Sequence, residues 1–244
     1  MRLLVTDIGN TNITIAFHDG TKWSGQERVK TKDKNCVSTY KEIISKYDFE
    51  NGVVSSVVPN LTGSIVRANE NIAKKNTILI SNSINTGLKC IPDELGSDIL
   101  CNLVAGHAIY PDDYVTIADF GTAFTTATVS PEGEVLGVTI GPGMMTSVKA
   151  LVQNTAQLPD LRLDLPETVL GRNSVESIKA GVIFGFTGQV EVITRQIERE
   201  LGNDVKLIVT GGFSKYIQQY INREFRADIY HTIEGARLIG LMNL

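Results

Sequence analysis

Leu3 to Phe17 reads LLVTDIGNTNITIAF, which predicts an apolar strand, a polar turn and a second strand. The first run is rich in Leu and Val, as a buried strand would be, and Asp7 stands at its end. Gly9 lets the backbone turn tightly enough for amide groups to approach a ligand closely. Three short polar residues follow, from Asn10 to Asn12. The stretch therefore predicts a strand-turn-strand element with an acid at the end of its first strand.

The same pattern returns in the second half of the chain. Val115 to Val129 reads VTIADFGTAFTTATV, and Asp119 and Gly121 stand where Asp7 and Gly9 stand, at an offset of 119 − 7 = 112 residues. Either copy alone could be an ordinary hairpin, because Asp and Gly are common turn residues. The repetition predicts a duplicated fold that grips a metal-bound polyphosphate from both sides. No G-x-x-x-x-G-K-[ST] motif occurs, so phosphate binding would rely on turn amides and hydroxyls.

Length and composition narrow the protein class. The 244 residues fit one large domain or two of about 120 residues. Cys36, Cys90 and Cys101 show no C-x-x-C spacing, so a disulfide framework or zinc site is not expected and a reducing cytoplasm fits. No apolar run approaches the length of about 18 residues that a membrane span needs. The net charge of −4, without a cluster of basic and aromatic residues, argues against a nucleic-acid surface.

The rest of the first half alternates strands with helices. The sequence predicts a strand within 21–31, a helix to Tyr47 capped by Ser38, a strand over 52–58, a helix over 60–75, a strand over 77–80 and a helix over 98–109. Strands that alternate with helices after a three-stranded meander imply a mixed sheet covered by helices.

The second half repeats this order from Tyr114. After the Asp119 turn, the sequence predicts a strand over 135–140, a break at 141–143, a helix over 144–152, a loop with Pro159 and Pro166, a helix over 174–201, a strand over 205–209 and a helix over 213–222. The two halves therefore share one order of elements.

Two glycine-rich stretches of the second half each have two interpretations. Gly181, Gly185 and Gly188 lie at helical spacing in the long helix and permit close contact, either with another helix of the same chain or with a second subunit. Gly211 and Gly212 follow a strand, where they either let a flat ligand approach or simply form a turn.

Four motifs resemble those of type III pantothenate kinases, and the resemblance runs nearly end to end. They are DIGNT at 7–11, DFGTA at 119–123, GPG at 141–143 and GRNS at 171–174. The resemblance implies an α/β fold of the actin and sugar-kinase superfamily. Such a fold is a duplicated ribonuclease-H-like fold with two mixed five-stranded sheets flanked by helices. It would place domains at 1–112 and 113–244, with an ATP cleft between the halves.

The same resemblance implies a reaction and its participants. The reaction is ATP-dependent phosphorylation of pantothenate to 4'-phosphopantothenate, the first step of coenzyme A biosynthesis. The implied cofactors are ATP with Mg²⁺ and a monovalent cation, K⁺ or NH₄⁺. The implied assembly is a homodimer in the cytoplasm.

Site residues are carried over by position. The resemblance implies that Asp98 is the general base, that Asp119 binds the monovalent cation and that Asp7 holds Mg-ATP. The implied ATP and phosphate site comprises Asp7, Ile8, Gly9, Asn10, Thr11, Asn12, Ile13, Thr14, Gly121, Thr122, Gly211 and Gly212. The implied substrate site comprises Gly96, Ser97, Asp98, Ile99, Gly143 and Ser174.

These residue types suit the chemistry. A carboxylate is a hard oxygen ligand for K⁺ or Mg²⁺, and hydroxyls and turn amides donate to phosphate oxygens without adding charge. An alcohol nucleophile needs a group that takes its proton. Without the resemblance, Asp98 would be read as an acid that favours the dipole of the helix it begins.

The chain departs from the family pattern around the acceptor. Ile99 stands where the family has an arginine that holds the substrate carboxylate, and the segment from Lys89 to Glu94 is shorter than the family's lid. Val138 also replaces a family glycine. Three functions stay open at this point: a pantothenate kinase, a kinase of the same fold for another small alcohol, and a catalytically poor regulatory protein that binds nucleotide.

Overall fold

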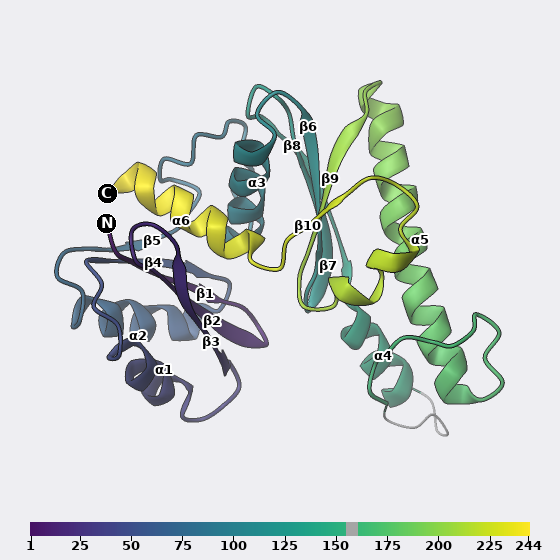
Figure 1. Cartoon of the computed structure of the whole chain (residues 1–244), viewed down its shortest axis with the longest axis horizontal. Coiled ribbons are helices and arrows are strands. Elements are labelled where there is room, and N and C mark those ends of the chain that lie inside the picture. The colour runs from purple at the N-terminus through teal and green to yellow at the C-terminus, as the bar shows by residue number, and fades with distance from the viewer. Residues whose placement is uncertain (155–160) are drawn as a thin grey trace. The chain divides into compact units, whose positions relative to one another are not determined.

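The computed structural model describes residues 1–154 and 161–244, which form two compact units (Figure 1). The first comprises Met1–Ile109, Gly133–Val135 and His231–Leu244, and the second comprises Tyr110–Glu132 and Leu136–Tyr230. The division into domains 1–112 and 113–244 stays a prediction. In the structure, the C-terminal segment His231–Leu244 belongs to the first compact unit. Pro159, part of a predicted loop, lies outside the described residues.

The first unit is built on a mixed five-stranded sheet. Its strands are β1 (Leu3–Ile8), β2 (Asn12–His18), β3 (Trp23–Lys30), β4 (Asn51–Ser56) and β5 (Thr77–Leu79), in the order β3-β2-β1-β4-β5. β1 pairs antiparallel with β2, and β2 antiparallel with β3, while β1 pairs parallel with β4, and β4 with β5. The opening meander is the predicted one.

Helices cover both faces of this sheet. Leu4 and Ile8 of β1 share a buried core with Tyr40 of α1 (Cys36–Ile44) and with residues of α2 (Pro59–Glu70). Leu3 and Val5 instead pack with residues of α3 (Ser97–Ile109) and α6 (His231–Asn243). Because side chains alternate along a strand, Asp7 lies on the same face as Leu3 and Val5. The sequence thus places the acid on the face that α3 covers.

The second unit repeats the same sheet order. Its strands are β6 (Tyr114–Phe120), β7 (Ala123–Val129), β8 (Val135–Pro142), β9 (Val205–Thr210) and β10 (Arg226–Ala227), in the order β10-β9-β6-β7-β8. β6 pairs antiparallel with β7 and parallel with β9, as β1 pairs with β2 and β4. Two mixed five-stranded sheets of one topology confirm the predicted duplicated fold.

Two helices of the second unit pack on its core. They are α4 (Met144–Gln153) and the long α5 (Ser174–Leu201). Phe120 and Phe124, which flank the second turn, pack with Phe186 of α5. The side chain of Asn173 accepts the backbone N–H of Glu176 and caps α5. The second turn is therefore anchored by aromatic packing against a capped helix.

Three local predictions are wrong or incomplete. Ser38 does not cap the first helix, because α1 already begins at Cys36 and Ser38 lies inside it. The helix predicted over 213–222 is two 3-10 turns, η1 (Ser214–Tyr216) and η2 (Gln218–Tyr220), since Ile221 adopts an extended backbone that ends the winding. The sequence pattern does not predict α6.

Among the described residues, no helix is long and apolar enough to cross a membrane.

Candidate active site

Hydrogen bonds fix the backbone of the first turn, which follows β1. One lies within the turn and two come from Thr31. The N–H of Gly9 donates to the carbonyl of Asn12 at 3.0 Å. From the end of β3, the Thr31 hydroxyl donates to the carbonyl of Gly9 at 2.7 Å, and its N–H donates to the carbonyl of Thr11 at 3.0 Å. Asn10 and Thr11 are exposed at the tip of the turn. Their polar groups are thus presented to solvent on a fixed backbone.

Other residues of the predicted phosphate loop flank this tip. Ile8 and Ile13 are fully buried in the core on the α1 and α2 face, so their side chains anchor the turn. Asn12 and Thr14 of β2 are half-buried. A role for the two isoleucines in ligand binding would therefore fall to their backbone.

Asp7 belongs to a cluster of hydroxyls at the ends of β1 and β4. In the parallel register, Asp7 lies opposite Ser55, whose hydroxyl donates to Asp7 Oδ1 at 2.9 Å. Ser55 Oγ also lies 3.1 Å from Ser97 Oγ, in the first turn of α3. Ser55 is fully buried and Ser97 nearly so. Asp7 is thereby tied through two serines to the helix that carries Asp98.

Asp98 is held in a folded conformation at the start of α3. Its Oδ1 accepts the N–H of Ile99 at 2.8 Å, and a Cβ placed on Gly96 would lie 2.7 Å from that oxygen. Burial raises the pKa of the Asp98 carboxyl above its usual value, an effect that backbone hydrogen bonds partly offset. Gly96 is thus the residue that leaves room for the carboxylate.

A buried thiol, that of Cys101, feels the charge of both acids. Burial raises the pKa of Cys101 well above its usual value, and the negative charges of Asp7 and Asp98 raise it further. Cys101 lies in α3, nearly one turn after Asp98, and it is fully buried. The structure therefore brings Asp7, Ser55 and Ser97 into one hydrogen-bonded cluster of the first unit, with Asp98 next to Ser97 at the start of α3.

The second turn is built like the first. The N–H of Gly121 donates to the carbonyl of Ala123 at 3.1 Å. Asp119 pairs in parallel register with Thr210, and the next residue, Gly211, has a φ of +90°. A Cβ on Gly211 would collide with the Asp119 carboxylate and with the backbone of Phe120. The predicted ATP residue Gly211 thus lies directly against the predicted cation ligand.

The Gly-Pro-Gly break also meets this turn. The N–H of Gly143 donates to the carbonyl of Thr122 at 3.0 Å, and the Thr146 hydroxyl donates to the same oxygen at 2.6 Å. A Cβ on Gly143 would run into the carbonyls of Gly121 and Thr122. Gly143, the N-cap residue of α4, therefore packs directly against the second turn at Thr122.

Three predicted residues lie apart from these contacts. Ser174 is exposed in the first turn of α5, and within the described residues no hydrogen bond joins its side chain to either turn. Gly212 is exposed, with open space around it. The side chain of Ile99, 8% exposed, is turned into the protein. These residues keep their predicted roles only as proposals.

Sequence reasoning missed the contributions of Ser55 and of the Gly211–Asp119 contact. Both depend on parallel strand pairing, which places Asp7 opposite Ser55 and Asp119 opposite Thr210, the residue before Gly211. The signal that was available for Ser55 is a pair of serines that ends a buried β-branched run, an unusual place for unneeded hydroxyls.

Mg²⁺ fits the carboxylates of the first unit. In proteins this ion is usually held by one or two carboxylates together with substrate phosphates and waters, not by an all-protein cage. Within residues 1–154 and 161–244, no group of three or more His, Cys, Asp and Glu side chains could hold a metal alone. Asp7, at the end of β1, supplies a carboxylate ligand of the kind that Mg²⁺ prefers.

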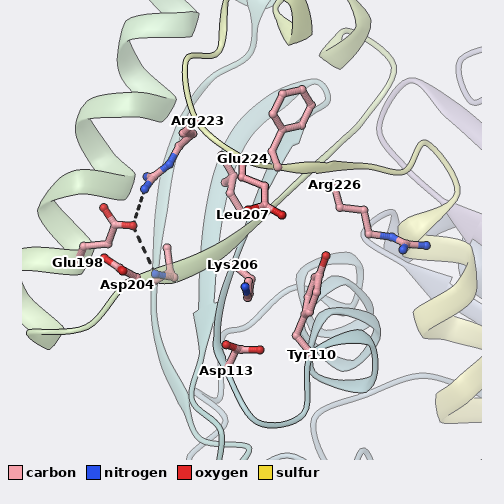
Figure 2. Close-up of a pocket in the computed structure, with 11 residues that line it drawn as sticks. Tyr110, Asp113, Glu198, Asp204, Lys206, Leu207, Arg223, Glu224 and Arg226 are labelled. Carbon is pink, nitrogen blue, oxygen red and sulfur yellow. Dashed lines mark hydrogen bonds and ion pairs between the residues drawn. The ribbon is translucent and has the colours of Figure 1, made fainter.

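A cavity of about 480 Å³ lies elsewhere in the second unit. Figure 2 shows it beside the ion pair of Glu198 and Arg223. It is lined by Val205 to Leu207 at the start of β9, whereas Gly211 follows the end of that strand. In open α/β sheets ligands bind at the carboxyl ends of strands, so we do not assign this cavity to the site.

Comparison with known proteins identifies relatives. The sequence model of the type III pantothenate kinase family matches residues 3–196. A type III pantothenate kinase from Myxococcus xanthus is 33% identical, over 97% of this chain and 97% of its own length.

Solved structures confirm the fold. A Baf family transcriptional activator from Campylobacter jejuni matches with a TM-score of 0.63 at 19% identity, covering 98% of each chain. Component A of (R)-2-hydroxyglutaryl-CoA dehydratase from Acidaminococcus fermentans matches with a TM-score of 0.56 at 12% identity, covering 98% of this chain and 96% of its own. At such identities the likeness concerns the fold alone.

Proposed function

Since the chain belongs to the type III pantothenate kinase family, we propose that it phosphorylates pantothenate with ATP and uses Asp98 as the general base. The product, 4'-phosphopantothenate, belongs to coenzyme A biosynthesis. The observation that supports this assignment of residues is the polar cluster of the first unit, in which Asp7 and Asp98 converge through Ser55 and Ser97.

Asp98 takes the proton that the reaction releases. A bond forms between the hydroxyl oxygen of pantothenate and the γ-phosphorus, the bond from that phosphorus to ADP breaks, and the hydroxyl proton passes to the carboxylate. Burial raises the pKa of Asp98, which makes it a better base than an exposed aspartate. Phosphoryl transfer depends mostly on positioning and charge stabilisation, so a carboxylate suffices as base.

Each turn, taken by itself, carries groups that suit the phosphates of ATP. Asn10 and Thr11 at the first tip, and Thr122 at the second, present amide and hydroxyl donors to phosphate oxygens. When bound, Mg²⁺ neutralises charge that develops on the phosphates. Asp7 holds that ion, and the glycines of the turns let the backbone come close to the nucleotide.

Asp119 binds the monovalent cation, K⁺ or NH₄⁺. It is half-buried at the end of β6, and the glycine turn of Gly211 packs on its carboxylate. A carboxylate with carbonyl oxygens of nearby turns is a suitable set of hard ligands. The proposal is supported by the second Asp-x-Gly turn and by the family to which the chain belongs.

A comparison of two acceptors tests the proposed substrate. ADP release would be measured with pantothenate and with pantothenyl alcohol, which carries a hydroxyl in place of the carboxylate. We expect turnover with pantothenate in K⁺ buffer. Turnover with the neutral analogue alone would favour the alternative of a same-fold kinase for an uncharged alcohol, which the missing arginine at position 99 suggests.

The side chain of Ile99 is 8% exposed and turned into the protein, so the longer arginine of Ile99→Arg must leave that position to reach the acceptor, and the variant should melt at a lower temperature. Where the guanidinium meets the substrate carboxylate, the KM for pantothenate is expected to fall by roughly tenfold to a hundredfold, because a charge-assisted hydrogen bond contributes about 1.5 to 3 kcal/mol. The change in kcat should be smaller, since the carboxylate is remote from the reacting hydroxyl and its binding is largely uniform. Steady-state kinetics on both proteins measure the two effects. Ile99→Lys is the matched control, which adds charge without the planar fork. An unchanged KM in a folded Ile99→Arg protein would contradict the expectation.

We further propose a cytoplasmic homodimer that pairs through α5. Gly181, Gly185 and Gly188 are exposed on this helix, and a Cβ at each would meet no atom of the described residues within 4 Å. Val192, 60% exposed, continues the stripe at helical spacing. A second copy of the helix could approach these small residues closely. The internal crossing that the sequence also allows is disfavoured by this open space.

Gly185→Arg should convert the dimer to a monomer. The bulky charge would block close approach, whereas the fold itself should not suffer, since arginine favours a helix over glycine by up to about 1 kcal/mol. Sedimentation should give 2 × 26.6 = 53.2 kDa for the natural protein and 26.6 kDa for the variant. Gly63→Arg, at an exposed glycine of α2, is the control that should remain dimeric. A natural protein that sediments as a monomer would overturn the proposal.

A further inference from the structure

We infer that Ser55 and Ser97 are positioning residues, which orient the Asp7 carboxylate for MgATP and fix it relative to the start of α3. The inference rests on the proposed function, because it assigns Asp7 to the ion that accompanies ATP. Neither serine touches the reacting atoms in this account. Their role is to set where a carboxylate oxygen points.

The hydrogen bonds run in one direction. An ionised carboxylate can only accept, so the single proton of the Ser55 hydroxyl goes to Asp7 Oδ1. Ser55 Oγ then accepts from Ser97 Oγ, 3.1 Å away, whose single proton is shared with the carbonyl of Ser56 at the same distance. Ser97 Oγ in turn accepts the backbone N–H of Ser56 at 2.9 Å. The chain therefore leads from a fixed backbone donor through two hydroxyls to one oxygen of Asp7.

Burial protects these hydrogen bonds from replacement by water. Ser55 is fully buried and Ser97 is 8% exposed, so water has little opportunity to replace either bond. Buried hydrogen-bond chains polarise one another, and a bond to a charged acceptor is stronger than a neutral one. The Ser55 hydroxyl, which donates to the Asp7 carboxylate, is thus protected from replacement by water.

The same chain joins two parts of the site. Ser55 is the next-to-last residue of β4, and Ser97 begins α3 one residue before Asp98. Ser97 Oγ also donates to the carbonyl of Ser56 at 3.1 Å while it accepts the Ser56 N–H, so the start of α3 is fastened to the end of β4 at more than one point. Any shift of α3 would therefore move the base and loosen the hold on Asp7 together.

The chain of hydrogen bonds from the Ser56 N–H through Ser97 and Ser55 to Asp7 is called the relay below. Next to it lies a second pair of hydroxyls, which points to the opposite face of the sheet. Ser56 Oγ lies 2.7 Å from Thr62 Oγ1 of α2, and Thr62 has no part in the relay. Thr62→Ala therefore removes a part-buried hydroxyl contact of similar length without touching Asp7. It is the control for a merely structural loss.

The experiment measures the Mg²⁺ dependence of the thermal stabilisation by ATP, which needs no turnover. Ser55→Ala should raise the Mg²⁺ concentration for half-maximal stabilisation by roughly tenfold to a hundredfold, the usual cost of removing a partner that orients a metal ligand. Ser97→Ala should shift it in the same direction. The double variant should resemble Ser55→Ala, because both changes interrupt one chain. Thr62→Ala should leave it unchanged.

Kinetics complete the test. Ser55→Ala should lower kcat at limiting Mg²⁺, with recovery at high Mg²⁺, and should leave the KM for pantothenate unchanged. A folded Ser55→Ala protein with the natural Mg²⁺ dependence would overturn the inference. If Ser55→Ala does not fold, the same readout on Ser97→Ala decides. A shifted Mg²⁺ dependence in a protein that does not phosphorylate pantothenate would support the relay and contradict the proposed function, so the two failures are distinct.

Discussion

Asp98→Asn is expected to lower kcat by roughly a hundredfold to ten-thousandfold, the usual cost of losing a general base. Asparagine keeps the size of the side chain and its oxygen can still accept the N–H of Ile99, so folding should be preserved. MgATP binding should persist as well, because Asp98 acts on the acceptor. Stopped assays over long times, combined with a thermal shift by MgATP, measure both quantities. Asp93→Asn, an exposed acid five residues upstream, is the matched control.

The pH dependence sharpens this prediction. Burial raises the pKa of Asp98, and the base must be ionised, so the rate should fall as the pH drops through that raised value. In the Asn variant this acid limb should disappear from the residual activity. Because the folded-state pKa is raised, ionised Asp98 costs stability above that pKa, and the variant should melt no lower than the natural protein at neutral pH. Near-normal turnover by the variant would return Asp98 to a role in the helix dipole.

Asp119→Ala is expected to remove both the response to monovalent cations and most of the activity. The natural protein should turn over faster in K⁺ or NH₄⁺ than in tetramethylammonium, an ion too large for a carboxylate site. The variant should be slower by roughly tenfold to a hundredfold, and equally slow in every buffer. Gly211→Ala should act in the same direction, since its methyl group would displace the Asp119 carboxylate.

Asp112→Ala, at an exposed acid before β6, controls for a general loss of surface charge. Initial rates in the three salts at equal ionic strength supply the comparison. Equal rates for the natural protein in all three would show that the cation assignment is wrong.

Much of the fold follows from local patterns. The two-residue alternation of β1 determines that Leu3, Val5 and Asp7 share a face. The bounds of α5 match the prediction of 174–201, because Asn173 caps its start and Gly202, with a φ of +66°, ends it. The helix predicted over 213–222 was wrong, because the segment forms two 3-10 turns that end at the extended backbone of Ile221. The Phe213 N–H is taken by the carbonyl of Phe120 in β6.

The site is less accessible from sequence than the fold. Asp7 and Asp119 could be found because each ends a strand before a glycine turn, twice in one chain. Asp98 owes its proposed role to the family resemblance, since an acid in the first turn of a helix is common. Ser55 and Gly211 needed the register of parallel strands, which no local pattern specifies. The absence of an arginine at position 99 is evident from the sequence alone.

Mass spectrometry of the products formed from pantothenate and MgATP in K⁺ buffer tests whether the protein phosphorylates pantothenate through Asp98. The account predicts a species heavier than pantothenate by one phosphoryl group, formed in the same amount as ADP, and nearly absent with the Asp98→Asn protein. A folded natural protein that binds MgATP but yields no phosphorylated pantothenate would contradict it.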